Sequence, residues 1–229
     1  MNQKRSKMLA KRLDLVDFIA NKQKETKLFF IVFYVVGILG MLIPATYPLF
    51  LKLIPFALIL SFAGLAVFHP NKWEKKSLAI FFGIFIIGYL IEVVGVNTGV
   101  IFGNYEYGGS LGFAIFNTPL IIGLNWLFLI YATSSVLEKF KFNNLVKISL
   151  ASAMMVLYDI VLEQVAPKID MWYWNENTIP LQNYLAWFVI AFLFHSIIKA
   201  FKIKTQNKLA LLILICQFLF FLFLYIFIS

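Results

Sequence analysis

The sequence is poor in the side chains that build most metal, redox and nucleophilic sites. Its 229 residues include one cysteine, Cys216, and two histidines, His69 and His195, which are far apart in the chain. A single cysteine inside an apolar run is typical of a small packing residue. The sequence also lacks a G-x-S-x-G, a P-loop and a dinucleotide-binding glycine motif. We therefore predict no metal site and no redox or nucleophilic chemistry.

Charged residues are scarce as well. They make up 14% of the chain, whereas 62% is hydrophobic and the mean hydropathy is +0.86. A soluble domain averages about 45–50% apolar and about 25% charged residues. The apolar runs are continuous rather than alternating, which is typical of helices and not of a membrane β-barrel. The composition predicts an all-α integral membrane protein.

The apolar runs predict about seven transmembrane helices, which form one domain over residues 28–229. The runs are 28–46, 48–69, 78–98, 117–136, 145–165, 183–201 and 208–228. A seven-helix count invites comparison with retinal proteins, which need a Schiff-base lysine inside a span. Residues 209–228 contain no lysine, and this argues against a retinal protein.

The 20 lysine and arginine residues predict the orientation. All but Lys52 and Lys168 lie before the first run or near the turns after the second, fourth and sixth runs. With seven crossings these positions share one side, which the positive-inside rule makes cytoplasmic. We expect a multi-pass protein of the cytoplasmic (inner) membrane, with its N-terminus inside and its C-terminus outside. The net charge of +9 then follows from topology and anionic lipid, so no nucleic-acid partner is predicted.

Residues 1–27 form a separate basic segment on the cytoplasmic side. Within it, residues 8–20 place Leu9, Leu13, Val16 and Ala20 on one helical face, away from Lys11 and Arg12. Such a pattern suits a short amphipathic helix on the inner membrane surface. The polar leader is too long for a signal peptide, and the first apolar run is long enough to remain a span.

Three acids lie inside the apolar runs. Glu92 is in the third run, and Asp159 and Glu163 are in the fifth. Each costs about 2.5–3.5 kcal/mol at the middle of a membrane helix, and such residues are functional by default. The spacing of four puts Asp159 and Glu163 on one helix face. Both runs cross from inside to outside, so all three acids should face one site near the outer leaflet. Gly95 and Gly99 should let another helix or a flat ligand approach the backbone.

Two segments repeat one order of residues. Glu92 is followed thirteen residues later by Tyr-Glu-Tyr (105–107), and Asp159 thirteen residues later by Trp-Tyr-Trp (172–174). Each triplet leads to a Pro-Leu pair with a tryptophan seven residues beyond the proline, at Trp126 and Trp187. This repetition predicts a duplicated two-helix unit with a site at the interface between the copies. Aromatic residues at membrane interfaces could produce part of the pattern.

The repeated segments also resemble a known family. Residues 92–126, EVVGVNTGVIFGNYEYGGSLGFAIFNTPLIIGLNW, are similar to the bacterial and archaeal carotenoid biosynthesis membrane family, which contains carotenoid 1,2-hydratases and bisanhydrobacterioruberin hydratase. The matching elements of the first block are Glu92, Thr98-Gly99, Phe102-Gly103-x-Tyr105-x-Tyr107, Leu111-Gly112, Pro119-Leu120 and Trp126. Those of the second are Asp159, Glu163, Trp172-x-Trp174, Ile179-Pro180-Leu181, Asn183-Tyr184 and Trp187. The resemblance covers about residues 84–195, and Gln164 departs from it where many relatives have proline.

The resemblance implies addition of water across the terminal C1–C2 double bond of an acyclic carotenoid end group, without a cofactor. A proton is delivered to C2, a tertiary carbocation forms at C1, and water captures it as a tertiary alcohol. The predicted catalytic residues are Asp159, Glu163 and Glu92. The predicted substrate-binding residues are Tyr105, Tyr107, Trp126, Trp172, Trp174, Asn97, Asn183 and Trp187. Aromatic faces would stabilise the cation, and Glu92, Asn97 or Asn183 would hold the water.

Two other functions remain open at this point. A carotenoid end-group cyclase or isomerase would begin with the same protonation but exclude water, so that an internal double bond captures the cation. A non-catalytic carotenoid- or lipid-binding protein, or a transporter, would use the acids to bind or move protons. The sequence does not predict which carotenoid is used, how many of its ends are hydrated, or the oligomeric state. It also does not predict which of the three carboxylates act as acid and which as base.

Overall fold

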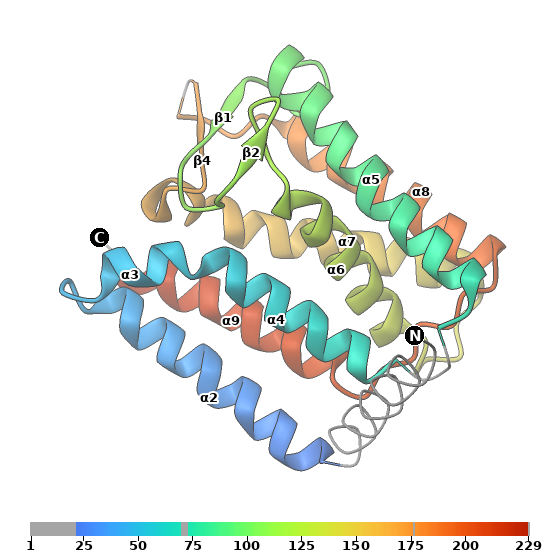
Figure 1. Ribbon diagram of the computed structural model, residues 1–229. Coiled ribbons are helices and arrows are strands. Elements are labelled where there is room, and N and C mark those ends of the chain that lie inside the picture. Colours follow the sequence, from blue (N-terminus) through green and yellow to red (C-terminus); the bar gives the residue numbers. More distant parts are fainter. Residues whose placement is uncertain (1–21, 70–72, 176, 229) are drawn as a thin grey trace, which may run out of the picture.

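The computed structural model describes residues 22–69, 73–175 and 177–228, which form a helical bundle with short strands at one end (Figure 1). Five helices within these residues are long and apolar enough to cross a membrane. They are α2 (Gln23–Leu42), α5 (Lys75–Thr98), α7 (Asn144–Glu163), α8 (Leu181–Ala200) and α9 (Ala210–Phe227). This confirms the helical membrane class. The seven crossings and the orientation stay predictions, and the amphipathic helix at 8–20 lies outside the described residues.

Two of the seven predicted runs form shorter helices than their length suggested. The run 48–69 is divided into α3 (Tyr47–Lys52) and α4 (Ile54–Val67). Pro55 lies in the first turn of α4, where proline is tolerated because its missing N–H has no helical partner there. The run 117–136 yields α6 (Ile121–Leu137), because Thr118 and Pro119 belong to a strand.

Helix α6 is the centre of the bundle. It packs against α4, α5, α7, α8 and α9, and every residue from Trp126 to Leu137 is buried. A helix that is apolar all round is expected in such a position. Glycine at position 88 of α5 allows a close contact with α6, since a Cβ there would lie 2.8 Å from the Cβ of Trp126. The packing therefore fixes the position of Trp126, which belongs to the site described below.

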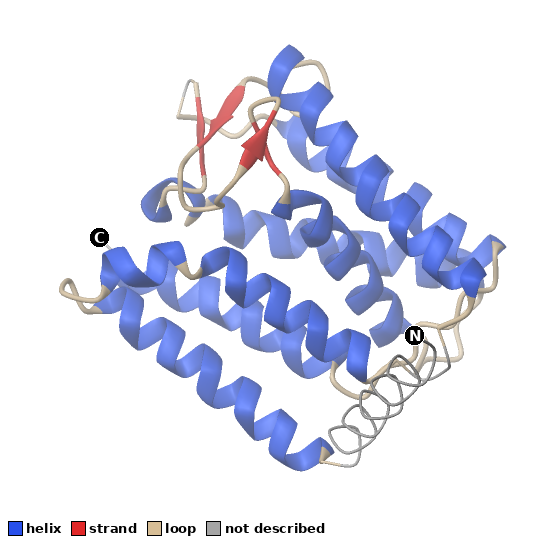
Figure 2. Cartoon of the chain, viewed as in Figure 1, coloured by secondary structure: helices blue, strands red, loops and turns tan. Residues whose placement is uncertain are grey.

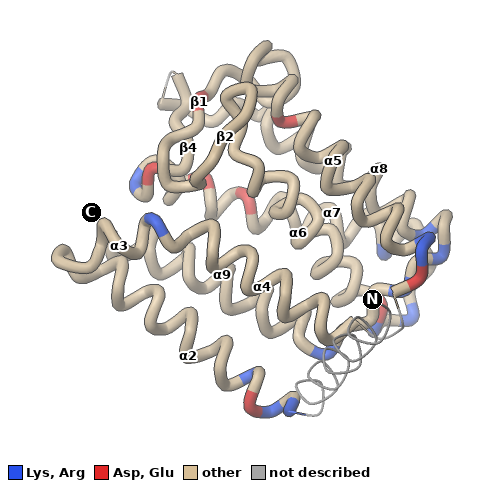
Figure 3. Tube along the Cα trace, in the orientation of Figure 1, with Lys and Arg blue, Asp and Glu red and all other residues tan. Residues whose placement is uncertain are grey.

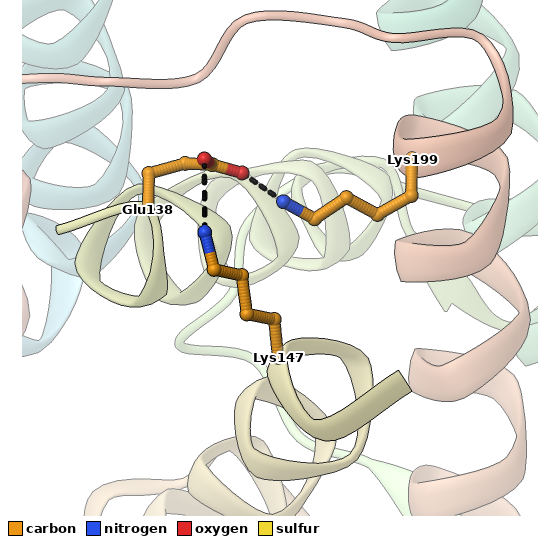
Figure 4. Close-up of polar contacts among 3 residues, drawn as sticks. All are labelled: Glu138, Lys147 and Lys199. Carbon is orange, nitrogen blue, oxygen red and sulfur yellow. Dashed lines mark hydrogen bonds and ion pairs between the residues drawn. The ribbon is translucent and has the colours of Figure 1, made fainter. Parts of the chain in front are cut away.

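Lysine and arginine residues gather at the end of the bundle where α2 and α5 begin and α8 ends (Figure 3). Among the described residues the exceptions are Lys52, at the end of α3, and Lys168, in the 3-10 helix η1 (Ala166–Ile169). At the basic end Glu138 pairs with Lys199 and, at 3.5 Å, with Lys147, which joins α6, α7 and α8 (Figure 4). Partial burial acts to raise the pKa of Glu138, but the two ammonium groups outweigh it and lower that pKa below its ordinary value.

The opposite end carries two small antiparallel strand pairs (Figure 2). One joins β2 (Ala114–Ile115) to β3 (Thr118–Pro119). The other joins β1 (Tyr105–Tyr107) to β4 (Trp172–Trp174), with Tyr105 opposite Trp174 and Tyr107 opposite Trp172. The two aromatic triplets of the repeated segments thus pair with each other. The chain contains two units of the same order, α5–β1–α6 and α7–β4–α8, which meet at this strand pair.

Candidate functional site

Glu92 on α5 is the acceptor at the centre of the first unit. Its side chain is 4% exposed. Oε2 accepts hydrogen bonds from the hydroxyls of Tyr105 at 2.6 Å and Tyr107 at 2.8 Å, and Oε1 accepts one from Nε1 of Trp126 at 2.8 Å. Burial, followed by the neighbouring Glu92 carboxylate, raises the pKa of both tyrosines well above the ordinary value. The tyrosines therefore keep their protons and remain donors to Glu92.

The chain after α5 turns back over Glu92 because two glycines permit it. Gly99 ends the helix with a φ of 66°, in the left-handed region that favours glycine. A Cβ at Gly95 would lie 2.5 Å from Cδ2 of Phe102, so only glycine leaves room for that ring. The sequence predicted that these glycines admit another helix or a flat ligand. They admit instead the loop that carries Tyr105 and Tyr107.

The second unit holds its acids with nitrogen donors. Nε1 of Trp172 and Nε1 of Trp174 donate to Oε2 of Glu163 at 2.9 and 2.7 Å. Nδ2 of Asn183, in the first turn of α8, donates both to Oε1 of Glu163 at 3.1 Å and to Oδ2 of Asp159 at 2.9 Å. One amide group thus holds the two carboxyl groups side by side, and Glu163 is 4% exposed.

Asp159 differs from the other two acids in its hydrogen bonds. It is 0% exposed, and its Oδ1 has no hydrogen-bond partner among the described residues. An unpartnered oxygen of a buried carboxylate is costly, because nothing replaces the lost hydration. A proton on that oxygen removes most of the cost. Asp159 is therefore the acid whose surroundings best suit a neutral carboxyl group.

Aromatic rings close the interface between the two units. The rings of Trp126 and Trp187 stack with centroids 4.4 Å apart. Tyr105 lies 5.1 Å from Trp174, and Tyr107 lies edge-on to Trp172 at 6.2 Å. Each pair takes one ring from each unit. The predicted meeting of the two repeated segments at one site agrees with this geometry.

A small cavity of about 30 Å³ lies between the units. Glu92 and Glu163 line it with the amides of Asn125 and Asn183, and rings from both units form the rest of its wall. A water molecule needs at least about 10–15 Å³ of such volume and two to four polar partners. The cavity therefore has the size and polarity for one or two waters between the carboxylates.

A second cavity, of about 260 Å³, lies beside the first. Its walls come from α2, α3, α4, α6, α7 and α9 and are almost entirely apolar. Ile122, Asn125 and Trp172 line both cavities, so the two are neighbours with common walls. Val36 of α2 and Phe56 of α4 also line the larger cavity and are 49% and 53% exposed, which places its mouth between these helices. An apolar chain could enter the larger cavity there, with its end beside the acids.

Most of the residues predicted for the site lie together, and Asn97 does not. Its Nδ2 donates to the carbonyl oxygen of Phe116 at 2.9 Å, and its Oδ1 accepts from Nδ2 of Asn117 at 2.9 Å. Phe116 and Asn117 have positive φ angles in the β2–β3 turn. Asn97 therefore stabilises this turn. Its side chain is exposed, so it does not hold a water molecule against the acids.

The sequence prediction placed the hydrocarbon in a slot between helices, but it did not include Asn125 in the site or identify the walls of the larger cavity. Asn125 lines both cavities, and its side chain has no hydrogen bond to any part of the chain that the structure describes. Its polarity inside the fourth run was the available indication. The walls supplied by α2, α4 and α9 could not be recognised, because an apolar residue that faces a cavity looks the same in sequence as one that faces lipid.

A comparison with protein families shows the family to which the chain belongs. The profile of the family described as "Carotenoid biosynthesis protein" matches residues 29–229. The match spans both repeated units and also α2, α4 and α9, which line the larger cavity. No curated protein and no solved structure matches the chain. With most of its length matched, this helical membrane protein belongs to the carotenoid biosynthesis protein family.

Proposed function

We propose that the protein is a cofactor-independent hydratase that adds water across the terminal C1–C2 double bond of an acyclic carotenoid end group. The observation that carries the proposal is the junction of the two cavities. A water-sized space between Glu92 and Glu163 shares its walls with an apolar cavity that opens between helices. A hydrocarbon and a water molecule can meet there beside an acid.

The larger cavity takes the hydrocarbon end of the substrate. Its volume and apolar lining suit an unsaturated chain that enters from the bilayer between α2 and α4. The tip then passes Ile122 and Trp172 to reach the carboxylates. The rest of the polyene lies in the membrane, so the partners of the protein are the carotenoid and its surrounding lipid.

The proton comes from the pair Asp159 and Glu163. Two neighbouring carboxyl groups that are held by one amide repel each other when both are ionised. The pair therefore retains one proton, which the two groups share. Glu163 lines the small cavity and is the group that delivers the proton to C2. Its Oε2 already accepts from both tryptophans, so the transferable proton resides on Oε1. Asp159, behind it, holds the proton between turnovers.

The tertiary cation at C1 lies next to Glu92 and the aromatic rings. A desolvated cation over an aromatic face gains about 2 kcal/mol or more, and Trp172 and Tyr107 line the small cavity. Glu92, fixed by three donors, supplies a negative charge that needs no reorganisation.

The water in the small cavity captures the cation. Asn125 and Glu92 orient it, and its surplus proton passes to Glu92. A second water returns that proton to the acid pair. One proton has moved to C2 and one hydroxide to C1, so the net change is the addition of one water, and every carboxyl group ends as it began.

We propose the membrane orientation given by the positive-inside rule, with seven crossings through the cytoplasmic membrane and the acids near the outer leaflet. The basic residues at the end opposite the strand pair support it (Figure 3). An alkaline phosphatase fused after residue 229 tests it. Activity of the fusion outside the cytoplasmic membrane is expected, and an inactive fusion with an active C-terminal fluorescent counterpart would contradict the proposed odd number of crossings.

The experiment that tests the function is co-expression with enzymes that supply an acyclic-ended carotenoid. Pigment masses are compared with an empty vector. A gain of one water per reacted end is expected. An isomer of unchanged mass would instead indicate a cyclase or isomerase, and unchanged pigment with bound carotenoid on the purified protein would indicate a binding protein. Glu106→Gln serves as the matched control, because Glu106 is exposed on β1 between the two site tyrosines.

A further inference from the structure

The basic end of the bundle contains a further cavity, of about 230 Å³, where α7 begins and α8 ends. None of the described residues that line it belongs to the two cavities of the candidate site. Its polar wall includes Glu138, Asn144, Lys199, Lys202, Lys204 and Gln206. One water molecule needs only about 10–15 Å³ of such volume, so this cavity has room for a larger polar group. The proposed reaction does not use this space.

Positive charge exceeds negative charge around this cavity. Among the lining residues Glu138 is the acid, and its carboxylate already pairs with Lys199 and Lys147 (Figure 4). The ammonium groups of Lys202 and Lys204 have no ion pair or hydrogen bond with another residue that the structure describes. The three lysines of the wall therefore leave a surplus of two positive charges over the one glutamate. An unpaired surplus of this kind favours an anionic ligand.

Lys202 stands at a backbone position that favours glycine. Its N–H donates to the carbonyl oxygen of Lys199 at 3.0 Å, and the N–H of the next residue donates to that of Ile198 at 2.9 Å. These two bonds form a Schellman motif, which ends α8 and gives Lys202 a φ of 54°. A side chain with a Cβ is disfavoured in this left-handed region. A lysine at such a position indicates that its side chain does more than end the helix.

The extended chain after α8 continues the row of lysines. From residue 203 to residue 209 the odd-numbered residues are buried, and Lys204, Gln206 and Lys208 are exposed. Successive side chains of an extended chain point to opposite sides, so these three lie in one outward row. Nδ2 of Asn207 fixes the segment by donating to a carbonyl oxygen of α4 at 2.8 Å. This wall of the cavity is therefore held in place without a ligand.

We propose that this cavity binds the phosphate group of an anionic membrane lipid. Lysine ammonium groups bind phosphate oxygens as compact point charges. The side-chain amides of Asn144 and Gln206 can donate hydrogen bonds to the same oxygens. Basic pockets between transmembrane helices hold anionic headgroups in this way.

Exposed apolar side chains beside the cavity favour a lipid over a free phosphate ion. Phe201 precedes Lys202 and is 47% exposed, and Leu145 follows Asn144 and is 64% exposed. They can contact the acyl chains of a lipid whose headgroup lies in the cavity, and a free ion makes no such contact. The proposal depends neither on the reaction at the opposite end of the bundle nor on which side of the membrane the basic end faces.

The test compares lipids that differ in headgroup charge. Full-length protein in detergent micelles is titrated with phosphatidylglycerol and with phosphatidylcholine, and native mass spectrometry counts the lipids bound. Each lysine near a membrane surface contributes about a fivefold gain in affinity, so we expect the first phosphatidylglycerol to bind about tenfold more tightly than phosphatidylcholine, or better. Inorganic phosphate at the same concentration should not displace the bound lipid.

Two variants locate the bound lipid, and a third is the matched control. Lys204→Gln should lower the affinity for phosphatidylglycerol about fivefold and leave that for phosphatidylcholine unchanged. Lys202→Gly should have the same effect on the lipids, and the lipid-free protein should remain at least as stable because glycine suits the left-handed backbone. Lys208→Gln removes the same charge from the same row outside the cavity, and should change neither affinity by more than about twofold. All three positions are exposed, so the variants should fold.

Four results would overturn the proposal. They are equal affinity of the natural protein for the two lipids, equal losses from Lys204→Gln and Lys208→Gln, an unchanged affinity for phosphatidylglycerol in Lys202→Gly, and displacement of that lipid by inorganic phosphate. The second would mean that the lysines act as a diffuse surface charge. The third would mean that Lys202 only ends α8, and the fourth that the cavity holds a free anion.

Discussion

The two units, α5–β1–α6 and α7–β4–α8, share one plan and treat their acids differently. In the first, a single carboxylate, Glu92, receives three hydrogen bonds, all from its own unit. In the second, two carboxyl groups share Asn183, and Oδ1 of Asp159 is left without a partner in the described residues. A carboxylate with a full set of donors suits a fixed negative charge. An incompletely bonded pair suits the storage and transfer of a proton.

The donors differ in kind as well. Glu163 is held by the N–H groups of Trp172 and Trp174, which can only donate. Glu92 is held partly by tyrosine hydroxyls, which can also accept. The hydroxyls of the first unit donate to Glu92 and keep lone pairs that can accept from a water molecule, whereas the indole groups of the second unit have none. In the proposed reaction the second unit accordingly supplies the proton donor and the first unit the base.

Removing the proton donor should have the largest effect. We expect Glu163→Gln to abolish conversion, with a loss of about 10²–10⁴-fold or more, because an amide cannot deliver a proton to an alkene. The amide can still accept from both tryptophans, so the protein should insert and purify normally. Product is quantified by chromatography and mass, with Glu106→Gln as control. Natural turnover by the Glu163→Gln protein would refute the assignment.

Asp159→Asn should also abolish detectable conversion while leaving the protein inserted and extractable. The reason is that the second carboxyl group keeps a proton available to Glu163, and asparagine ends that sharing. Conversion is measured against the amount of membrane-extracted protein. Turnover equal to that of the natural protein would show that Asp159 has no part in the acid pair.

Glu92→Gln tests the first unit. Loss of a preorganised charge beside a developing cation typically costs about 10²–10³-fold in kcat. The loss should fall on kcat and leave carotenoid binding, measured by tryptophan quenching, nearly unchanged. Lower expression with a normal rate per molecule would instead mark Glu92 as structural.

A smaller effect is expected from Tyr107→Phe. Glu92 then keeps two of its three donors, and one hydrogen bond to a charged group is worth about 1.5–3 kcal/mol, so the rate should fall roughly ten- to a hundredfold. The equivalent change in the second unit, Trp172→Phe, removes one of the donors to Glu163. Equal pH profiles for the two variants would contradict the different roles assigned to the units.

The smallest effect should come from the basic end of the bundle. Glu138→Gln breaks the ion pairs with Lys147 and Lys199, which are partly exposed and worth about 0–1 kcal/mol. Conversion should not change, and the midpoint of thermal unfolding should fall slightly. Because the carboxylate has a lowered pKa, its stabilisation is present near neutral pH and is lost as the pH falls through that pKa. A large loss of activity would show that the basic end of the bundle is coupled to the site.

The sequence indicated which residues belong to the candidate site better than it indicated how they are arranged. Glu92, Asp159 and Glu163 could be found because an acid in an apolar run almost always faces the interior of the helix bundle. The thirteen-residue spacing likewise led to the two aromatic triplets. Their antiparallel pairing could not be predicted, since strands of three residues between long helices carry too few side chains for a period-two pattern.

One equivalence in the repeat was misleading. By spacing, Asp159 corresponds to Glu92, yet Glu163 is the acid that accepts from the strand aromatics as Glu92 does. The two residues are one helical turn apart on the same face, so sequence spacing alone cannot choose between them. Asn97 was included as an amide that could hold the water against the cation. Its partners in the β2–β3 turn depend on a loop conformation that the sequence does not reveal.

The most direct test of the central claim follows the two atoms that water supplies. Purified protein in nanodiscs is given an acyclic-ended carotenoid in ²H₂O enriched in ¹⁸O, and the product is analysed by mass spectrometry and NMR. We predict one ¹⁸O at C1 and one deuterium at C2 from solvent in each hydrated end. A product without solvent oxygen, or a deuterated isomer of the starting pigment, would contradict the account.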